Sequence, residues 1–166
     1  MHEGNHDLRP RAYFEKYCPA LDDYNPFGLD TLLDFDGFGV RLLPDFYEFA
    51  RGWVSTHGHL GFSLNRIVGV TALNAAKRIG KNVICGHTHR AGIVSESTGY
   101  GGKLQTVTGM EVGHLMDIGK ADYLRNGWAN WQCTFAIVDI SGRLVSPHVV
   151  PVAPDGSFIA DRRCRR

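Results

Sequence analysis

Three short clusters of histidine, asparagine and aspartate are the residues of this sequence best suited to chemistry. They are Gly4-Asn5-His6-Asp7, His57-Gly58-His59 and Gly86-His87-Thr88-His89. Neutral imidazoles and an amide oxygen suit Mn²⁺, Zn²⁺ or Fe²⁺ better than Ca²⁺. The glycines let the chain turn sharply and present the following side chains toward a shared centre. The pattern therefore predicts a divalent-metal site, and two such ions can clamp a phosphate during in-line displacement.

The last two clusters follow short runs that predict β-strands. One strand is expected around Phe49–Thr56 and another over Val83–Cys85. Between them, helical periodicity predicts a helix over Leu64–Ile79, with Ser63 as its N-cap and Gly80 just past its end. Strand, helix and strand in this order favour a parallel crossover and an α/β fold. Ligands bind at the carboxyl edge of such sheets, which is where the histidine clusters would lie. The apolar face of the helix is expected to comprise Leu64, Ile67, Val68, Thr71, Ala72, Ala75 and Ile79.

The rest of the chain is expected to be irregular at first and rich in β-structure later. A helix is expected after the first seven residues, with Pro10 in its first turn and Ala12, Phe14, Glu15, Lys16 and Tyr17 continuing it. An irregular insertion or lid follows over Pro19–Gly39, which is rich in Asp, Gly and aromatic residues. The later β-type runs are 92–97, 104–108, 133–140, 144–152 and 158–160, with turns at 101–102, 141–142 and 155–156.

The composition is that of a globular protein. The chain has 166 residues, 43% of them hydrophobic and 21% charged, and its formal net charge is +1. This length suits one domain over residues 1–166. The balanced charge gives no general case for binding nucleic acid or an anionic membrane, and no apolar run approaches the roughly 18 residues of a membrane helix. The start of the sequence lacks a secretory pattern, and the four cysteines are far apart. We therefore expect a cytoplasmic protein with reduced thiols and no membrane partner.

The three clusters resemble the motifs of the calcineurin-like metallophosphoesterases. In that family a GNH(D/E) motif, a His-Gly pair and a GHxH motif follow one another in this order, as they do here. The region from Gly109 onward, with Glu111-Val112-Gly113 and Trp131-Gln132, looks like the tail of phage-encoded members. Three ordered motifs are far more specific than any one of them, and the resemblance covers nearly the whole chain. It implies the C-terminal part of an αββα sandwich, an α/β fold with two β-sheets flanked by helices.

The resemblance also implies a role for each motif residue. Asn5, His57 and His87 would ligate one metal ion, and His89 the other. His6 would be catalytic, either as general acid toward the leaving oxygen or as a stabiliser of developing charge. The implied reaction is hydrolysis of a phosphate mono- or diester by a metal-activated water at a dinuclear site, with Mn²⁺ as the favoured cofactor and Zn²⁺ or Fe²⁺ as alternatives. Nucleotides and nucleic-acid ends are candidate substrates, in the host cytoplasm if the gene is phage-borne.

Three more residues are candidates for binding the substrate. His59 would contact the phosphate or cap the following loop, and Arg90 and Arg9 are candidate phosphate contacts because they lie close to the motifs in sequence. The histidines outside the motifs are expected to be ordinary hydrogen-bonded residues: His2, His114 and His148.

One part of the family pattern does not occur in these 166 residues. Family members carry Asp-x-His and then Gly-Asp upstream of GNHD, and the second carboxylate bridges the two metals; neither motif is present here. The sequence thus accounts for half of a dinuclear centre, and the predicted strands would lack neighbours. We expect a miscalled start or truncation, or a complementing N-terminal polypeptide. A self-associated form or a degraded remnant would also account for the missing half.

Two other classes of function remain open. A non-catalytic remnant or subunit would bind one metal ion or a protein partner without turnover. A nucleic-acid-binding module would use the arginines of residues 162–166 and stack bases on Trp53, Trp128 and Trp131. A solvated tail and core or lid packing are the favoured interpretations of these two features.

Overall fold

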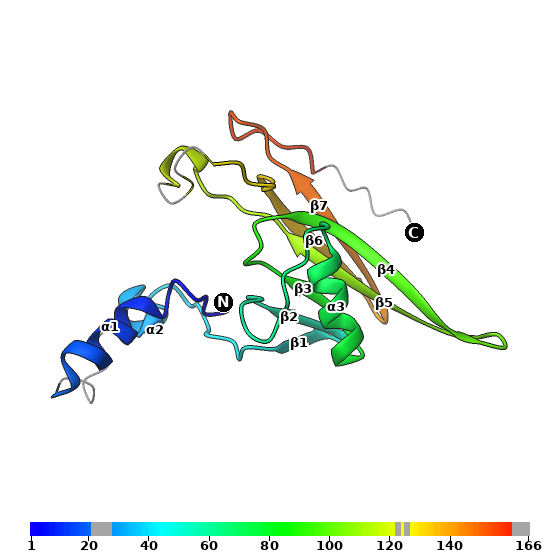
Figure 1. Ribbon diagram of the computed structural model, residues 1–166, viewed down its shortest axis with the longest axis horizontal. Helices are drawn as coiled ribbons and strands as arrows, with labels where there is room; N and C mark the ends of the chain where they lie inside the picture. Colours follow the sequence, from blue (N-terminus) through cyan, green and yellow to red (C-terminus); the bar gives the residue numbers. More distant parts are fainter. Residues whose placement is uncertain (21–27, 122–123, 125–126, 161–166) are drawn as a thin grey trace.

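A helix, a five-stranded sheet and a two-stranded sheet form three stacked layers in the computed structural model (Figure 1). The structure describes residues 1–20, 28–121, 124 and 127–160. The expected α/β class with two sheets is confirmed. In the described ranges no helix packs on the outer face of the smaller sheet, so the helical layer expected there is not seen.

The larger sheet has the strand order β1-β2-β3-β5-β4. The β2–β3 and β3–β5 pairs are parallel, whereas β1–β2 and β4–β5 are antiparallel. The five strands are β1 (Tyr47–Ala50), β2 (Trp53–Thr56), β3 (Asn82–Cys85), β4 (Ala91–Tyr100) and β5 (Lys103–Val112). The smaller sheet is the antiparallel pair of β6 (Thr134–Ser141) and β7 (Leu144–Pro151).

The crossover from β2 through α3 (Val70–Ile79) to β3 confirms the predicted parallel unit. Helix α3 packs Ala75 and Ala76 against Val83 on one face of the sheet. Its contact with β5 depends on Gly109, because a Cβ at that position would lie 2.0 Å from the backbone nitrogen of Leu73. This close approach fixes the helix above the strands whose ends carry the histidines.

The predicted start of this helix is wrong. The helix begins at Val70, after Gly69 in a left-handed conformation (φ 80°), and not after Ser63. Residues Leu64 and Ile67, expected on the core face, are 64% and 67% exposed. A left-handed Gly69 cannot continue an α-helix, so the apolar periodicity upstream of it marks an extended loop.

The single strand expected around Phe49–Thr56 is also wrong, because the chain folds there into the β1–β2 hairpin. The turn between the strands includes Gly52, whose φ of 75° is a left-handed conformation that glycine adopts at little cost. A tight turn inside an apolar run has little effect on the hydrophobic pattern, so the sequence pattern merged the two strands.

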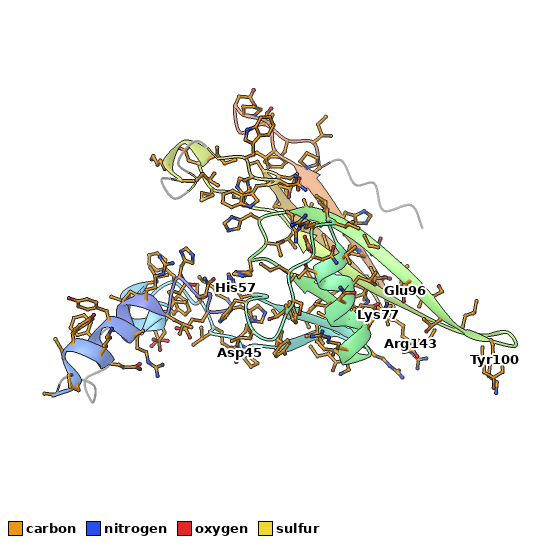
Figure 2. All side chains as sticks on the ribbon, viewed as in Figure 1. Asp45, His57, Lys77, Glu96, Tyr100 and Arg143 are labelled. Carbon is orange, nitrogen blue, oxygen red and sulfur yellow. The ribbon has the colours of Figure 1, made fainter. Side chains whose placement is uncertain are left out.

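The β-rich half confirms most of the later predictions. Gly101 and Gly102 form the two-residue turn between β4 and β5. This hairpin extends well beyond the other strands of the sheet, and Tyr100 lies at its tip (Figure 2). The predicted 158–160 run forms only a bridge between Val152 and Phe158. The β6–β7 sheet covers a core of Trp53, Ile84 and Met110 on the face opposite α3.

The N-terminal region is attached to this framework by a few contacts. Helix α1 (Arg9–Tyr17) forms as expected but buries no side chain. Helix α2 (Leu29–Leu32) lies within the predicted irregular insertion, part of which is outside the described residues. None of the helices in the described ranges has the length and apolar character to span a bilayer. Cys18, Cys85 and Cys133 carry free thiols, as expected, and Cys164 lies outside the described residues.

Candidate metal centre

Asn5, His57 and His87 meet at the carboxyl edge of the parallel strands, although they come from three separate segments. The ring nitrogen Nε2 of His57 lies 3.3 Å from Oδ1 of Asn5, and the ring centroids of His57 and His87 are 5.2 Å apart. The parallel pairing of Thr56 with Cys85 brings the two strand ends side by side. Figure 2 shows His57 where the N-terminal segment reaches the sheet.

His59 joins the same group of side chains. Its ring centroid is 5.1 Å from that of His57 and 6.2 Å from that of His87. Both of its ring nitrogens are buried and have no hydrogen-bond partner among the described residues. Burying two unpaired polar atoms costs free energy, so this ring is available for an interaction that none of the described residues supplies.

The backbone at His87 and His89 is strained. Their φ angles are 59° and 58°, and Asp34 is the only other non-glycine residue with a positive φ in the described part of the chain. The left-handed conformation costs an L-residue roughly 1–2 kcal/mol. Such strain is concentrated at functional sites, where it fixes the direction of a side chain. Here it turns two successive histidines of one loop toward the sheet edge.

Burial favours the neutral form of His57, His87 and His89, because it lowers the pKa of each. Burial first, and then the charges of His87 and His59, lowers the pKa of His57 to about 4. The pKa values of His87 and His89 are also lowered, in both cases chiefly by burial and then by neighbouring histidines. Neutral imidazole is the form that binds metal ions, so no proton has to be displaced at neutral pH.

His89 has a different neighbour, which the sequence pattern did not assign to the site. Its ring centroid lies 5.8 Å from that of His114 and 4.5 Å from that of Trp131. His114 is buried, and its Nε2, like Nδ1 of His89, has no hydrogen-bond partner among the described residues. The expectation that His114 is an ordinary hydrogen-bonded residue is therefore met at Nδ1, which accepts from the Met116 amide at 3.1 Å, and is wrong at Nε2. Its position just past the end of β5 was the available signal.

The same expectation is confirmed for the other two histidines outside the motifs. Both ring nitrogens of His2 have oxygen partners at 2.9 Å, on Pro44 and Ser55. The ring of His148 lies 2.8 Å from the Ser146 hydroxyl. Neither histidine is placed for a role in the metal centre.

His6 lies near both halves of the histidine group. It is exposed, and its charge contributes to lowering the pKa of His87 and of His89. Arg9, in contrast, is exposed at the start of α1, and no hydrogen bond or ion pair in the described ranges joins it to the histidines. Its contact with a phosphate stays a prediction.

Arg90 is held by a buried network beneath the histidine loop. Its Nε lies 3.3 Å from Oε2 of Glu111, and its guanidinium also donates to Thr71 Oγ1 and the Asn65 carbonyl. Glu111 is fully buried and accepts a further hydrogen bond from Thr88 Oγ1 at 3.1 Å. Since Thr88 stands between the two strained histidines, this network holds their loop. The phosphate contact expected of Arg90 stays a prediction.

The donor atoms fit a divalent metal of the Mn²⁺, Zn²⁺ or Fe²⁺ type, but the set is incomplete. An amide oxygen and neutral imidazoles are ligands that these ions accept. Within the described residues, however, no three His, Cys, Asp or Glu side chains are grouped so as to hold one ion. The ligand set implied by the resemblance is therefore incomplete within the described residues, and metal binding stays a prediction.

Replacing Gly4 by alanine is expected to displace His57. The added Cβ would lie 2.7 Å from Cε1 of the His57 ring, and that ring must then move. We expect metal affinity to fall about 10- to 100-fold, the effect of disturbing the support of a ligand. Isothermal titration with Mn²⁺ measures it. Gly86→Ala is the matched control, because its Cβ would meet nothing closer than 3.6 Å; equal affinities for the two variants would contradict the assignment of His57.

Two curated relatives match nearly the whole chain. The Gene 54 protein of Mycobacterium phage L5 is 48% identical over 165 residues, which are 98% of this chain and 64% of the relative. The Gene 54 protein of Mycobacterium phage D29 is 48% identical over 163 residues, which are 97% of this chain and 64% of the relative. No family model and no solved structure matches the sequence. The chain is thus related to mycobacteriophage proteins, of whose length it spans just under two thirds, and the metallophosphoesterase resemblance stays a prediction.

Proposed function

We propose that this chain carries the histidine-rich half of a metal-dependent phosphoesterase that hydrolyses phosphate mono- or diesters. The observation that carries the proposal is the meeting of Asn5, His57 and His87 at one sheet edge, from three segments that lie far apart in sequence. The strained His87 and His89 backbones and the unpaired ring nitrogens of His59 support it. A purely structural cluster would satisfy those nitrogens.

In this proposal Asn5, His57 and His87 hold one divalent ion, and His89 binds the second. When bound, such ions supply a nucleophile from water and neutralise charge on the phosphate oxygens. The chain's own residues do the rest. His59, with both ring nitrogens unpaired among the described residues, faces the phosphate as a hydrogen-bond donor. His6 donates the proton that the leaving oxygen takes up.

We assign the missing ligands to a segment that corresponds to the unmatched part of the phage relatives. The phage relatives extend beyond the matched region, which is 64% of their length. A carboxylate from such a segment would add the ligand that His57 and His89 lack among the described residues. Because the relatives are phage proteins, the proposed reaction takes place in the cytoplasm of the host.

The test measures metal content and turnover together. The chain is purified alone and also joined to the unmatched part of the phage L5 relative, in the order of that relative. Elemental analysis gives the metal content, and an aryl phosphodiester with Mn²⁺, Zn²⁺ or Fe²⁺ reports turnover. We expect at most about one ion in the chain alone, and two ions with turnover in the joined protein.

His57→Ala in the joined protein is the control. We expect it to lose both the added metal and the turnover. Absence of turnover with all three metals would overturn the enzymatic proposal and favour a non-catalytic metal-binding subunit. Turnover that survives His57→Ala would show that the reaction takes place at a different site.

A further inference from the structure

A cavity of about 510 Å³ opens beside His89, outside the residues assigned to metal binding. Thr88 and Arg90, which flank His89 in sequence, both line it. Trp131 lines it too, and its ring is in edge-on contact with the His89 ring. Sites for small molecules have volumes of roughly 300–1,000 Å³, so a ligand of moderate size fits in this cavity, next to His89.

Two tryptophans give the cavity flat apolar surfaces. Trp128 is 103% exposed, although indole is among the side chains that proteins prefer to bury. Trp131 is half-buried and is held by its contacts with His89 and His114. An indole left in solvent at the mouth of a cavity is suited to stacking on a planar ligand. Every nucleobase has a flat π-face, so an aromatic side chain can stack on any of the bases.

A positively charged side chain in the cavity wall favours a ligand that carries a negative charge. Arg66 lines it, is exposed, and has no hydrogen bond or ion pair among the described residues. The charge of Arg90 is balanced by the buried Glu111, so Arg66 is the cation left for a ligand. The amides of Asn65 and Asn130 add polar groups to the wall. A planar ring joined to a phosphate matches this combination of indole, guanidinium and amide.

We propose that the cavity binds the nucleoside part of a nucleotide, with the base against Trp128 and the phosphate toward Arg66 and His89. The proposal rests on the proposed phosphoesterase function for the role of this nucleotide as substrate. The terminal residue of a nucleic-acid strand and a free nucleotide share the required chemistry. Trp128 is thereby the specificity residue, which distinguishes a nucleotide from a simple phosphate ester, and Arg66 binds the phosphate of either ligand.

The test measures binding in the absence of metal, so that it does not depend on turnover. The 166-residue chain is titrated in EDTA with adenosine 5′-monophosphate and with ribose 5-phosphate, which lacks the base, by isothermal calorimetry. Stacking of one base on an aromatic residue contributes about 1–3 kcal/mol, which corresponds to about 5- to 150-fold in affinity. We expect the nucleotide to bind more tightly by a factor in this range.

Variants locate the interaction. Trp128→Ala is expected to abolish the difference between the two ligands, whereas Trp128→Phe retains most of it. Arg66→Ala is expected to weaken both ligands by the same factor. Tyr100→Ala is the matched control, since Tyr100 is an aromatic side chain 90% exposed at the far tip of the β4–β5 hairpin (Figure 2). It should leave both affinities unchanged.

The outcomes separate this proposal from the proposed function. Equal binding of the two ligands, no binding of the nucleotide, or a base preference that survives Trp128→Ala would each overturn the nucleotide site. Failure of the joined protein to hydrolyse any phosphoester, with base-dependent binding intact, would overturn only the enzymatic proposal. Parallel titrations with 5′-phosphorylated oligothymidylates of several lengths identify the source of the ligand. An affinity that rises with strand length indicates the end of a nucleic-acid strand, and a constant affinity indicates a free nucleotide.

Discussion

Replacing His87 by alanine is expected to lower the affinity of the chain for Mn²⁺ by at least about 100-fold. Disturbing a residue that merely supports a metal ligand costs about 10- to 100-fold, and His87 is assigned as a ligand itself. Its ring centroid lies 5.2 Å from that of His57, the ring that is paired with Asn5. Isothermal titration at neutral pH measures the change, and in the joined protein turnover should fall with it.

His148→Ala is the control for this loss. Its ring bonds to Ser146 on strand β7, so its removal should leave metal affinity unchanged. If His87→Ala bound Mn²⁺ as tightly as the unmodified chain, His87 would not be a ligand and the proposed centre would fall with it.

A glycine at the same position separates a functional role from a structural one. His87→Gly relieves roughly 1–2 kcal/mol of left-handed strain. It costs about 0.4–1 kcal/mol of stability because glycine raises the conformational entropy of the unfolded chain. Stability should therefore stay the same or rise, while metal affinity falls as in the alanine variant. A residue kept only for packing would lose stability in both variants.

Replacing Glu111 by glutamine is expected to destabilise the fold by about 3–5 kcal/mol, the cost of breaking a buried ion pair by removing one partner. Glu111 is fully buried, and the Arg90 side chain opposite it is only 11% exposed. Without the carboxylate, the guanidinium is left in the interior without a counter-charge. Glutamine keeps the size of the side chain, so the change measures the charge and its hydrogen bonds. Urea unfolding followed by circular dichroism gives the loss.

The matched control is a pair at the surface. Lys77 and Glu96 are joined at 2.7 Å but remain 44% and 39% exposed, so Glu96→Gln should cost no more than about 1 kcal/mol (Figure 2). Equal losses in the free energy of unfolding of Glu111→Gln and Glu96→Gln would mean that the buried pair stabilises the fold no more than the exposed pair does. Because Glu111 also accepts from Thr88, we expect Glu111→Gln to loosen the loop of His87 and His89.

Local sequence was sufficient to locate the elements that carry the candidate ligands. Val83–Cys85 is an apolar run followed at once by Gly86 and His87, and the strand ends where the apolar run ends. The α/β class, the crossover and the hairpin turns at 101–102 and 141–142 follow from the same short-range signals. Boundaries failed where one backbone conformation decided them. The left-handed Gly69 delays the start of α3, and Gly52 divides one predicted strand into two. The hydrophobic pattern contains no sign of either conformation.

Only the tertiary structure decided which residues surround the site. The parallel pairing of β3 with β5 carries Glu111 under the histidine loop and His114 next to His89, and such pairings join residues far apart in sequence. It also turned Arg90 from a free cation into the partner of a buried carboxylate. The chain by itself therefore determined the chemical types of the candidate ligands and the strand ends that present them. Their neighbours, burial and charge balance were determined by long-range strand pairing, because the energies that select a register come from the packed core and not from any local segment.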